Sequence, residues 1–254
     1  MPEPPTILQI IPELDTGGAE RSTVEIAEAI VRGKGRALVM AQGGRMVTAL
    51  TDAKGEFIAF PAASKNPATI LLNAKRIATT IRQQNVQLIQ AESRAPAWSA
   101  YAAARQRGTP FVTTFHGVYN FTNALKRHYN AIMTRGAWVI ANSHFIGAHI
   151  VENYGVAADR IKIIPRGVDV KRFDPLAIAA ARIIKLARQW RLPDGLPVVM
   201  LPGRLARWKG QMVLIEAVAR MTARRDCPPF TTVLVGDDQG RTGYRDEIQR
   251  QIET

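Results

Sequence analysis

Short apolar runs alternate along this chain with longer segments whose apolar residues recur at helical spacing. The runs at residues 6–11, 36–41, 57–60, 86–90, 110–115, 138–141 and 161–165 predict strands. The segments at 66–84, 95–107, 123–135 and 143–154 predict helices, as does an earlier one through Val24 and Ile30. Strands separated by helices of this length indicate βαβ units and a parallel sheet covered on both faces. The first domain is therefore predicted to be doubly wound α/β.

A second α/β unit follows. A mixed helix is predicted at 176–190, and a turn at 193–195 ends it. The pattern then predicts a strand at 196–201, a helix from Lys209 or Gly210, a strand at 231–235 and a helix from about Tyr244. We expect an N-terminal domain at 1–175, a linker helix and junction at 176–195, and a partial second domain at 196–254.

This second domain is short for independent folding. About sixty residues with two strands lie at the small end of what folds alone. Parallel strands that are buried on both faces also need neighbours. Either the piece docks on the first domain, or the sequence is a fragment that stops in mid-helix at Thr254. We expect the fragment.

Composition excludes several protein classes. Of the 254 residues, 46% are hydrophobic and 22% charged, as in an ordinary globular protein. No apolar run approaches the ~20 residues that span a bilayer, and the first residues lack the features of a signal peptide. The single cysteine, Cys227, excludes an internal disulfide, and no Cys/His cluster has metal-ligand spacing. We expect a soluble, cytoplasmic protein.

The net charge of +13 indicates an anionic partner. Nucleic acid, an anionic membrane surface and anionic small ligands are the candidates. The basic residues are scattered along the chain, without a zinc finger, an aromatic RNA-binding strand or a basic arm. Each basic residue near an anionic leaflet can contribute about 1 kcal/mol, so a basic face can hold a protein on a membrane. We rank peripheral association with the inner face of the membrane above nucleic acid.

Two strand-to-helix turns carry candidate chemistry. Gly17 and Gly18 follow the first strand, without the GxGxxG pattern of dinucleotide binders. They allow a ligand close to the backbone or simply form a tight turn, and both readings stay open. The second turn, at 202–210, holds Arg204 and Lys209 ahead of a helix N-terminus. These cations suit a diphosphate; the alternative is a solvated basic turn.

Taken in order, five motifs carry a family resemblance. They are Gly17-Gly18-Ala19-Glu20, His116-Gly117-Val118, Ala141-Asn142-Ser143, the segment 164–169 with Phe173, and Gly203-Arg204 with Lys209-Gly210. The set resembles the family-four glycosyltransferases, retaining GT-B enzymes that use nucleotide sugars and include lipopolysaccharide and glycolipid enzymes. The resemblance implies two Rossmann-like domains across a cleft, with acceptor on the N-terminal one and most of the donor on the C-terminal one.

The resemblance also implies site residues. Arg204 and Lys209, with Gly203, would bind the donor diphosphate, and the two cations would stabilise the leaving nucleoside diphosphate. Gly17 and Gly18 would let the first loop close over the diphosphate or the transferred sugar. The third catalytic candidate, His116, would contact the donor sugar or the reacting centre; the alternative is a buried histidine bonded to a backbone carbonyl. Weaker acceptor-side candidates are Ser93 and Arg94, and Asp169 is expected to order the turn after Gly167.

The chain departs from the family in two places. Arg166 stands before Gly167 where the family usually has asparagine. The two glutamates, eight positions apart, that contact the donor in this family are missing, because Asp246, Glu247 and Glu253 lie in the wrong context. The donor site is therefore expected to be incomplete and this chain alone to be inactive.

The sequence thus predicts a glycosyltransferase that moves a hexose from a nucleotide diphosphate sugar to a glycan or lipid-linked acceptor. Cell-envelope polysaccharide or lipopolysaccharide synthesis is the expected setting, because the resemblance implies such acceptors and the basic chain favours a lipid-linked one. No cofactor or metal is expected, since Arg204 and Lys209 can neutralise the diphosphate. One alternative is a truncated, non-catalytic paralogue that binds a membrane or a partner. The other, a nucleic-acid binder, would show a steep salt dependence.

Overall fold

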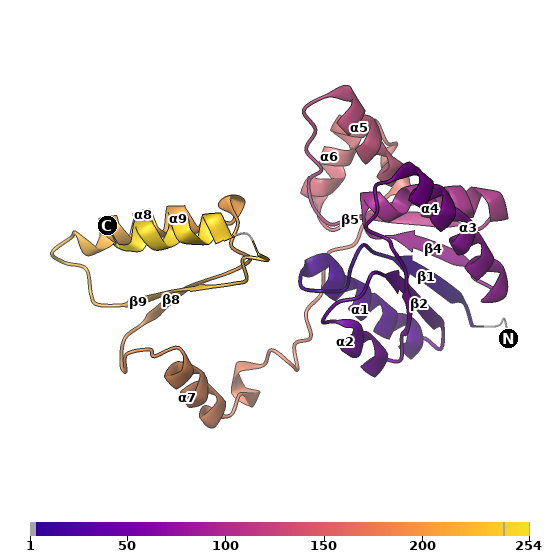
Figure 1. Cartoon of the computed structure of the whole chain (residues 1–254). Coiled ribbons are helices and arrows are strands. Elements are labelled where there is room, and N and C mark those ends of the chain that lie inside the picture. The colour runs from indigo at the N-terminus through magenta and orange to yellow at the C-terminus, as the bar shows by residue number, and fades with distance from the viewer. Residues whose placement is uncertain (1–3, 241, 254) are drawn as a thin grey trace. The chain divides into compact units, whose positions relative to one another are not determined.

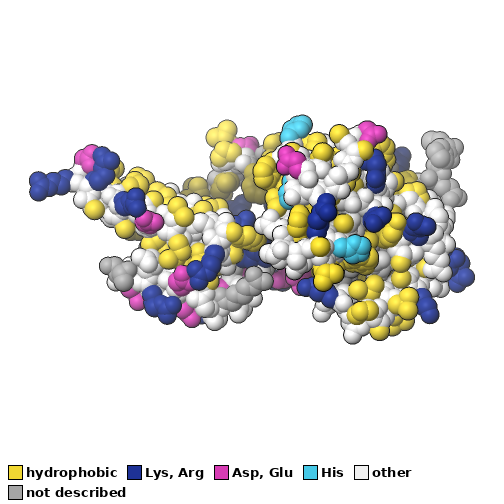
Figure 2. Space-filling view, turned by 90° about the horizontal axis from the view of Figure 1, so that it is seen from above, with side chains coloured by type: hydrophobic (Ala, Val, Ile, Leu, Met, Phe, Trp, Pro, Cys, Tyr) yellow, Lys and Arg dark blue, Asp and Glu magenta, His cyan; other side chains and the backbone are white. Residues whose placement is uncertain are grey.

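The computed structural model describes residues 4–240 and 242–253, so the predicted outer boundaries at residues 1 and 254 lie outside it. The chain forms two compact units, divided between Gly167 and Val168. No helix in the described ranges is both long enough and apolar enough to cross a bilayer. On the face shown in Figure 2, Lys and Arg side chains are dispersed among other types.

The first unit is built on a parallel sheet of seven strands within the described residues. These are β1 (Thr6–Ile10), β2 (Arg36–Ala41), β3 (Glu56–Ala59), β4 (Leu88–Ala91), β5 (Phe111–Phe115), β6 (Trp138–Ala141) and β7 (Ile161–Ile163). Their order is β3-β2-β1-β4-β5-β6-β7, with every pair parallel. The winding direction reverses between β1 and β4. The loops after these two strands therefore flank the switch point at which open α/β sheets bind ligands.

Helices cover both faces of this sheet. They are α1 (Gly18–Arg32), α2 (Val47–Asp52), α3 (Pro67–Gln83), α4 (Arg94–Arg107), α5 (Ala124–Asn130) and α6 (His144–Tyr154), with 3₁₀ turns at Ala131–Thr134 and Ala158–Arg160. Figure 1 shows α1 and α2 on one face and α3 and α4 on the other. The predicted doubly wound α/β domain is confirmed. The helix predicted at 123–135 is shorter, because its last turn tightens to 3₁₀, and the six-residue α2 was not predicted.

Strand β2 shows how both faces are filled. Leu38 and Met40 belong to the core on the side of α3 and α4, whereas Ala37, Val39 and Ala41 belong to the core on the side of α1 and α2. All five are at most 1% exposed. Because successive side chains in a strand point to opposite faces, an unbroken apolar run fills two cores at once. The candidate polar site residues therefore lie in the loops that follow the strands.

Local signals fix several helix ends in this unit. The Asn66 side chain accepts hydrogen bonds from the first turn of α3, and the Ser143 Oγ accepts one from the Ile146 amide at the start of α6. Gly108 and Gly155 end α4 and α6 in the left-handed region, with φ of 67° and 66°. The helix stop predicted at Gly108 is confirmed.

The second unit contains two parallel strands within its described residues, β8 (Val198–Pro202) and β9 (Thr231–Val235). Its helices are α7 (Ala180–Gln189), α8 (Gln211–Thr222) and α9 (Thr242–Glu253), with 3₁₀ turns at Pro175–Ala177 and Arg207–Lys209. Figure 1 shows α8 and α9 together along one face of the strands. The side chains of Val198 and Met200 are 44% and 48% exposed. This strand pair therefore does not bury its apolar residues on both faces.

One predicted helix start in this unit was wrong, and another agrees to within a residue or two. The helix predicted from residue 176 begins at Ala180, because Asp174 caps a separate 3₁₀ turn and Ile178 and Ala179 are extended. The helix expected to begin near Lys209 or Gly210 begins at Gln211, directly after its N-cap Gly210, whose φ of 83° separates it from the preceding 3₁₀ turn.

Candidate functional site

The first loop brings a basic side chain against a glycine. Gly17 is the N-cap of α1 and has extended backbone, with a φ of 163°, that any residue adopts. At Gly18 a Cβ would lie 2.0 Å from Nη1 of Arg166, the flexible end of that side chain. The Arg166 side chain therefore lies close to the Gly18 backbone, and the approach of a ligand to this loop stays a prediction.

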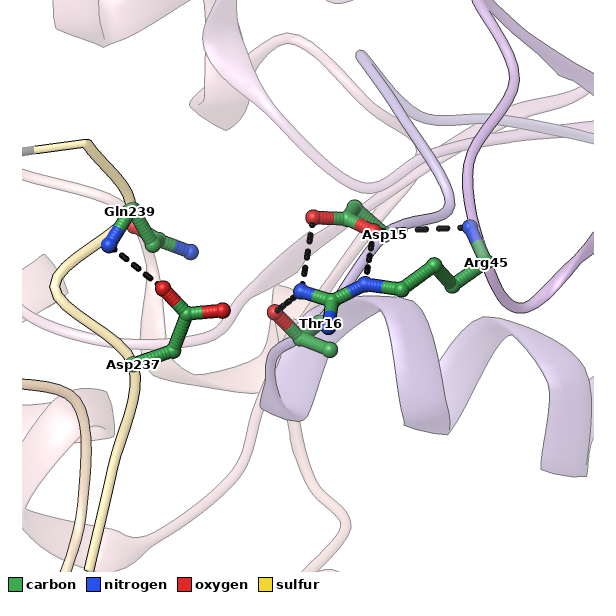
Figure 3. A network of polar contacts seen from close by, with 5 residues as sticks. All are labelled: Asp15, Thr16, Arg45, Asp237 and Gln239. Atoms are coloured by element: carbon green, nitrogen blue, oxygen red, sulfur yellow. Dashed lines mark hydrogen bonds and ion pairs between the residues drawn. The ribbon is translucent and has the colours of Figure 1, made fainter.

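Arg45 holds the same loop from its other side (Figure 3). Its Nε donates to Oδ1 of Asp15 at 2.6 Å, and its Nη2 donates to Oδ2 of Asp15 at 3.2 Å and to Oγ1 of Thr16 at 3.1 Å. These hydrogen bonds lower the pKa of Asp15. Gly44 makes the contact possible, since its φ is 136° and a Cβ would lie 2.4 Å from the Leu14 carbonyl oxygen.

His116 is the centre of a three-residue cluster at the carboxyl edge of the sheet. It follows β5, Glu92 follows the neighbouring β4, and Arg166 lies beyond β7. Its Nε2 lies 2.6 Å from Oε2 of Glu92, and its Nδ1 lies 2.9 Å from Nη2 of Arg166. The side chains of His116 and Glu92 are 11% and 0% exposed. The alternative in which the ring binds a backbone carbonyl was wrong, because both ring nitrogens have side-chain partners.

The geometry selects one tautomer of His116. A guanidinium can only donate, so Nδ1 accepts from Arg166 and the ring proton lies on Nε2, from which it is donated to Glu92. Oε1 of Glu92 is buried and has no hydrogen-bond partner among the described residues. A neutral imidazole therefore connects a buried anion to an exposed cation. For His116 to reach a sugar through Nδ1, Arg166 is the partner that has to move.

The predicted acceptor-side residues line a cleft of about 880 Å³. Ser93 is the N-cap of α4, although its side chain makes no capping hydrogen bond. Nη1 of Arg94 donates to Oδ1 of Asn130 at 2.9 Å, and its guanidinium lies 4.5 Å from the ring centroid of Tyr119. Burial raises the pKa of Tyr119 to about 12, against the opposing influence of Arg94. The phenol is therefore a protonated hydrogen-bond donor at neutral pH.

Sequence reasoning missed two further residues of this cleft. Lys65 precedes α3 and Lys126 lies in α5, and both line the same walls as Arg94. Each is one lysine among many in a basic chain, and no motif marks either of them. Lys65 follows β3 and Lys126 follows β5, so both lie at the carboxyl edge of the same sheet, and this position is the signal that identifies them.

In the second unit, Arg204 and Lys209 both lie close to the indole of Trp208. The Arg204 Cζ and the Lys209 Nζ are each 5.5 Å from the Trp208 ring centroid. Nη1 of Arg204 donates to the amide oxygen Oε1 of Gln239 at 2.8 Å, so this partner is neutral. The two predicted donor-binding cations are thus brought together, and neither forms an ion pair with a carboxylate in the part of the chain that the structure describes. An anion is the ligand that suits them.

Two close contacts support this turn. A Cβ on Gly236 would lie 1.9 Å from the Gly203 carbonyl oxygen, so the ends of β8 and β9 meet backbone to backbone. Gln211 is fully buried, and its Nε2 donates to the Arg204 carbonyl oxygen at 3.0 Å. Gln211 was not among the predicted site residues. It ties the first residue of α8 to the backbone that carries the arginine.

Neighbouring polar residues have structural roles. The Gln239 amide donates to Oδ1 of Asp237 at 2.6 Å, which shapes the turn after β9 (Figure 3). Oδ1 of Asp169 accepts from the amides of Lys171 and Arg172, which confirms its predicted role in ordering that turn. Glu247 accepts from the exposed Arg207. Within 4–240 and 242–253, no group of three His, Cys, Asp or Glu residues is placed to hold a metal ion.

Comparison with known proteins gives a consistent result. The family described as Glycosyltransferase Family 4 matches residues 16–172. D-inositol 3-phosphate glycosyltransferase from Pseudarthrobacter chlorophenolicus is 30% identical over 149 residues, which cover 54% of this chain and 34% of that protein. The chain therefore spans about a third of the length of this curated relative.

Solved structures resemble both units of the chain. A glycosyltransferase from Rickettsia africae shares 37% identity with a TM-score of 0.83, and the match covers 98% of this chain and 65% of that one. HepE from Anabaena, solved in complex with UDP-glucose, shares 27% identity with a TM-score of 0.80 over the same fractions. Both are longer than the chain described above.

Proposed function

This chain belongs to glycosyltransferase family 4, whose retaining enzymes have the GT-B architecture, and we propose that it transfers a hexose from a nucleotide diphosphate sugar with retention of configuration. Residues 1–175 would form the acceptor-side domain, 176–195 the linker helix and junction, and 196–254 part of the donor-binding domain. The convergence of Arg204 and Lys209 on Trp208 is the observation that carries the proposal.

The chemistry of the second unit supports binding of the donor diphosphate. Negative charge grows on the leaving nucleoside diphosphate as the glycosidic bond breaks. Arg204 has a forked guanidinium, Lys209 is a mobile point charge, and Gly203 keeps the strand end free of a side chain. Fixed cations at the place where charge develops are the interactions that accelerate such a reaction. Neither cation has a carboxylate partner among the described residues, so both charges remain available.

Residues of the first unit would contact the transferred sugar and the acceptor. Gly17 and Gly18 would let the first loop approach the diphosphate or the transferred sugar, and His116 would contact the sugar after Arg166 moves from Nδ1. Ser93 and Arg94 would face the acceptor. Relatives show the range of chemistry to test: one is named for D-inositol 3-phosphate, and another was solved with UDP-glucose.

We further propose a glycan or lipid-linked acceptor in cell-envelope polysaccharide or lipopolysaccharide synthesis. The net charge of +13 supports peripheral association with an anionic membrane. Work at that surface would place the enzyme where lipid-linked acceptors are presented. The proposed location is therefore the cytoplasmic face of the membrane.

A donor panel on the complete protein tests the transferase proposal. UDP-, GDP- and ADP-hexoses are supplied with envelope glycolipid extract, and NMR of the product reports the anomeric configuration. Release of nucleoside diphosphate with a retained anomer is the expected result. Inverted product would refute retention. No transfer from any donor, together with binding to anionic vesicles, would favour the non-catalytic membrane-binding alternative.

A further inference from the structure

Arg166 places a positive charge beside His116, the residue proposed to contact the transferred sugar. Nη2 of Arg166 lies 2.9 Å from Nδ1 of His116, and a Cβ on Gly18 would lie 2.0 Å from its Nη1. The guanidinium thus stands between the loop that follows β5 and the first turn of α1. All three residues belong to the first unit, so this arrangement does not depend on where the second unit lies.

The charge of Arg166 is not neutralised by a carboxylate of the described residues. Its hydrogen-bond partner there is the neutral imidazole of His116. Glu92 is bonded to the other ring nitrogen, and Glu20 is folded back toward Gly17, where a Cβ would lie 2.2 Å from its Oε2. Neither glutamate forms an ion pair with Arg166. An exposed guanidinium with a neutral partner keeps its charge and most of its N–H donors for a ligand.

The chemistry of the sugar decides how the Arg166–His116 contact is replaced. This hydrogen bond has to break before a sugar can reach Nδ1 of His116. A hydroxyl of a neutral sugar gives the imidazole a new donor but gives the guanidinium no charged partner. A carboxylate accepts two parallel N–H bonds from a guanidinium, and such a pair is stronger than a single bond to a neutral imidazole. A sugar that carries both a hydroxyl and a carboxylate therefore provides a partner for each of the two side chains.

We propose that Arg166 selects a donor whose sugar is negatively charged, a hexuronic acid in which C6 is a carboxylate. The guanidinium binds that carboxylate, and Nδ1 of His116 accepts a hydrogen bond from a hydroxyl of the same sugar. The inference rests on the proposed transferase function, because it names the substrate class of that site. The donor diphosphate is the other anion that suits Arg166, and two donors that share the diphosphate but differ at C6 distinguish these partners.

Two matched variants of the complete protein test the role of Arg166. Arg166→Asn removes the charge and keeps a neutral side chain that can donate to His116. Arg76→Asn is the control, because Arg76 is an exposed arginine in α3, away from the cluster. The ligands are methyl glucuronide and methyl glucoside, which differ only at C6. Titration at about 0.15 M salt, followed by nitrogen-15 NMR of the His116 ring, measures affinity in the absence of a nucleotide sugar.

The expected result is that the glucuronide binds about tenfold or more tightly than the glucoside, because only the glucuronide forms the charge-assisted pair. Arg166→Asn should lower the affinity for the glucuronide by about the same factor and leave the affinity for the glucoside unchanged. Arg76→Asn should change neither affinity. Equal binding of the two glycosides, no binding of the glucuronide, or the same glucuronide affinity in both variants overturns the proposal.

Transfer assays with UDP-glucuronate and UDP-glucose extend the test to the reaction. The ratio of kcat/KM for the two donors should favour UDP-glucuronate and should fall about tenfold or more in Arg166→Asn. A damaged fold does not produce this change in the ratio, because it lowers activity with both donors alike. An equal loss with both donors would mean that Arg166 contacts the diphosphate that they share, and that result overturns the proposal.

Binding and transfer are measured separately, so the two proposals can fail separately. Transfer from UDP-glucose without a preference for UDP-glucuronate would overturn the selection of a charged sugar and leave the transferase function intact. Binding of the glucuronide that depends on Arg166, without transfer from any donor, would support the role of Arg166 and refute the transferase function.

Discussion

Arg204→Ala is the substitution that most directly tests the donor site. The guanidinium contacts a neutral amide and the face of Trp208, and it is not part of an ion pair with a carboxylate in the described residues. Its charge is therefore available to the departing diphosphate. A charge-assisted contact of this kind is worth ~1.5–3 kcal/mol. Since 1.36 kcal/mol corresponds to a factor of ten in rate, turnover of the full-length enzyme should fall about ten- to a hundredfold.

Steady-state kinetics with a varied donor concentration measure this effect. If the guanidinium helps mainly as charge develops on the leaving group, kcat falls more than KM rises. The unfolding free energy should fall by at most about 2 kcal/mol, because Arg204 is half-buried and its removal costs a neutral hydrogen bond and a ring contact, each worth about 1 kcal/mol. A thermal melt of the variant checks that the fold is retained.

Arg207→Ala is the matched control for Arg204→Ala. It removes one positive charge from the same turn, but Arg207 is paired with Glu247 and its side chain is 73% exposed. Exposed ion pairs contribute about 0–1 kcal/mol, so neither stability nor turnover should change appreciably. Unchanged kinetics for Arg204→Ala would refute the diphosphate role, and an equal loss in both variants would show that only the net charge matters.

Three further expectations concern the first unit. Nitrogen-15 NMR of the His116 ring should show the Nε2–H tautomer alone. Arg166→Ala should produce a mixture of the two ring tautomers, because Nδ1 loses its hydrogen-bond donor. A mixture of tautomers in the unsubstituted protein would contradict the hydrogen bonds of the Glu92–His116–Arg166 cluster. Burial raises the pKa of Tyr119 to about 12, whereas an unfolded tyrosine ionises near 10. Stability should therefore fall as pH rises from about 10 to 12, and Tyr119→Phe should reduce that fall, measured by urea unfolding, by about 2–3 kcal/mol; an identical pH profile would refute the shift. Ser143→Ala removes the cap on the Ile146 amide and should lower the unfolding free energy, measured by urea unfolding, by about 1 kcal/mol; an unchanged unfolding free energy would contradict the cap.

The periodicity of apolar residues located the strands and the long helices, but not the six-residue α2. The β2 run fills two cores, so it had to be a strand covered on both faces, and Gly108 ended its helix as expected. The same logic placed Ser93, His116 and Arg204 after strands, where loops meet ligands. Helix starts at Ala180 and Gln211 were less predictable, because they depend on a cap at Asp174 and on the backbone of Gly210.

What the sequence by itself determined is the set of strands and helices and the chemical character of the turns between them. Only the tertiary structure decided which turns meet. Glu92 and His116 are 24 positions apart, and His116 and Arg166 are 50 apart, yet parallel strand order makes them one cluster. Lys65 and Lys126 join Arg94 for the same reason. The physical cause is that hydrophobic periodicity specifies which face of each element is buried, whereas the neighbours of a strand are fixed by the packing of the whole sheet.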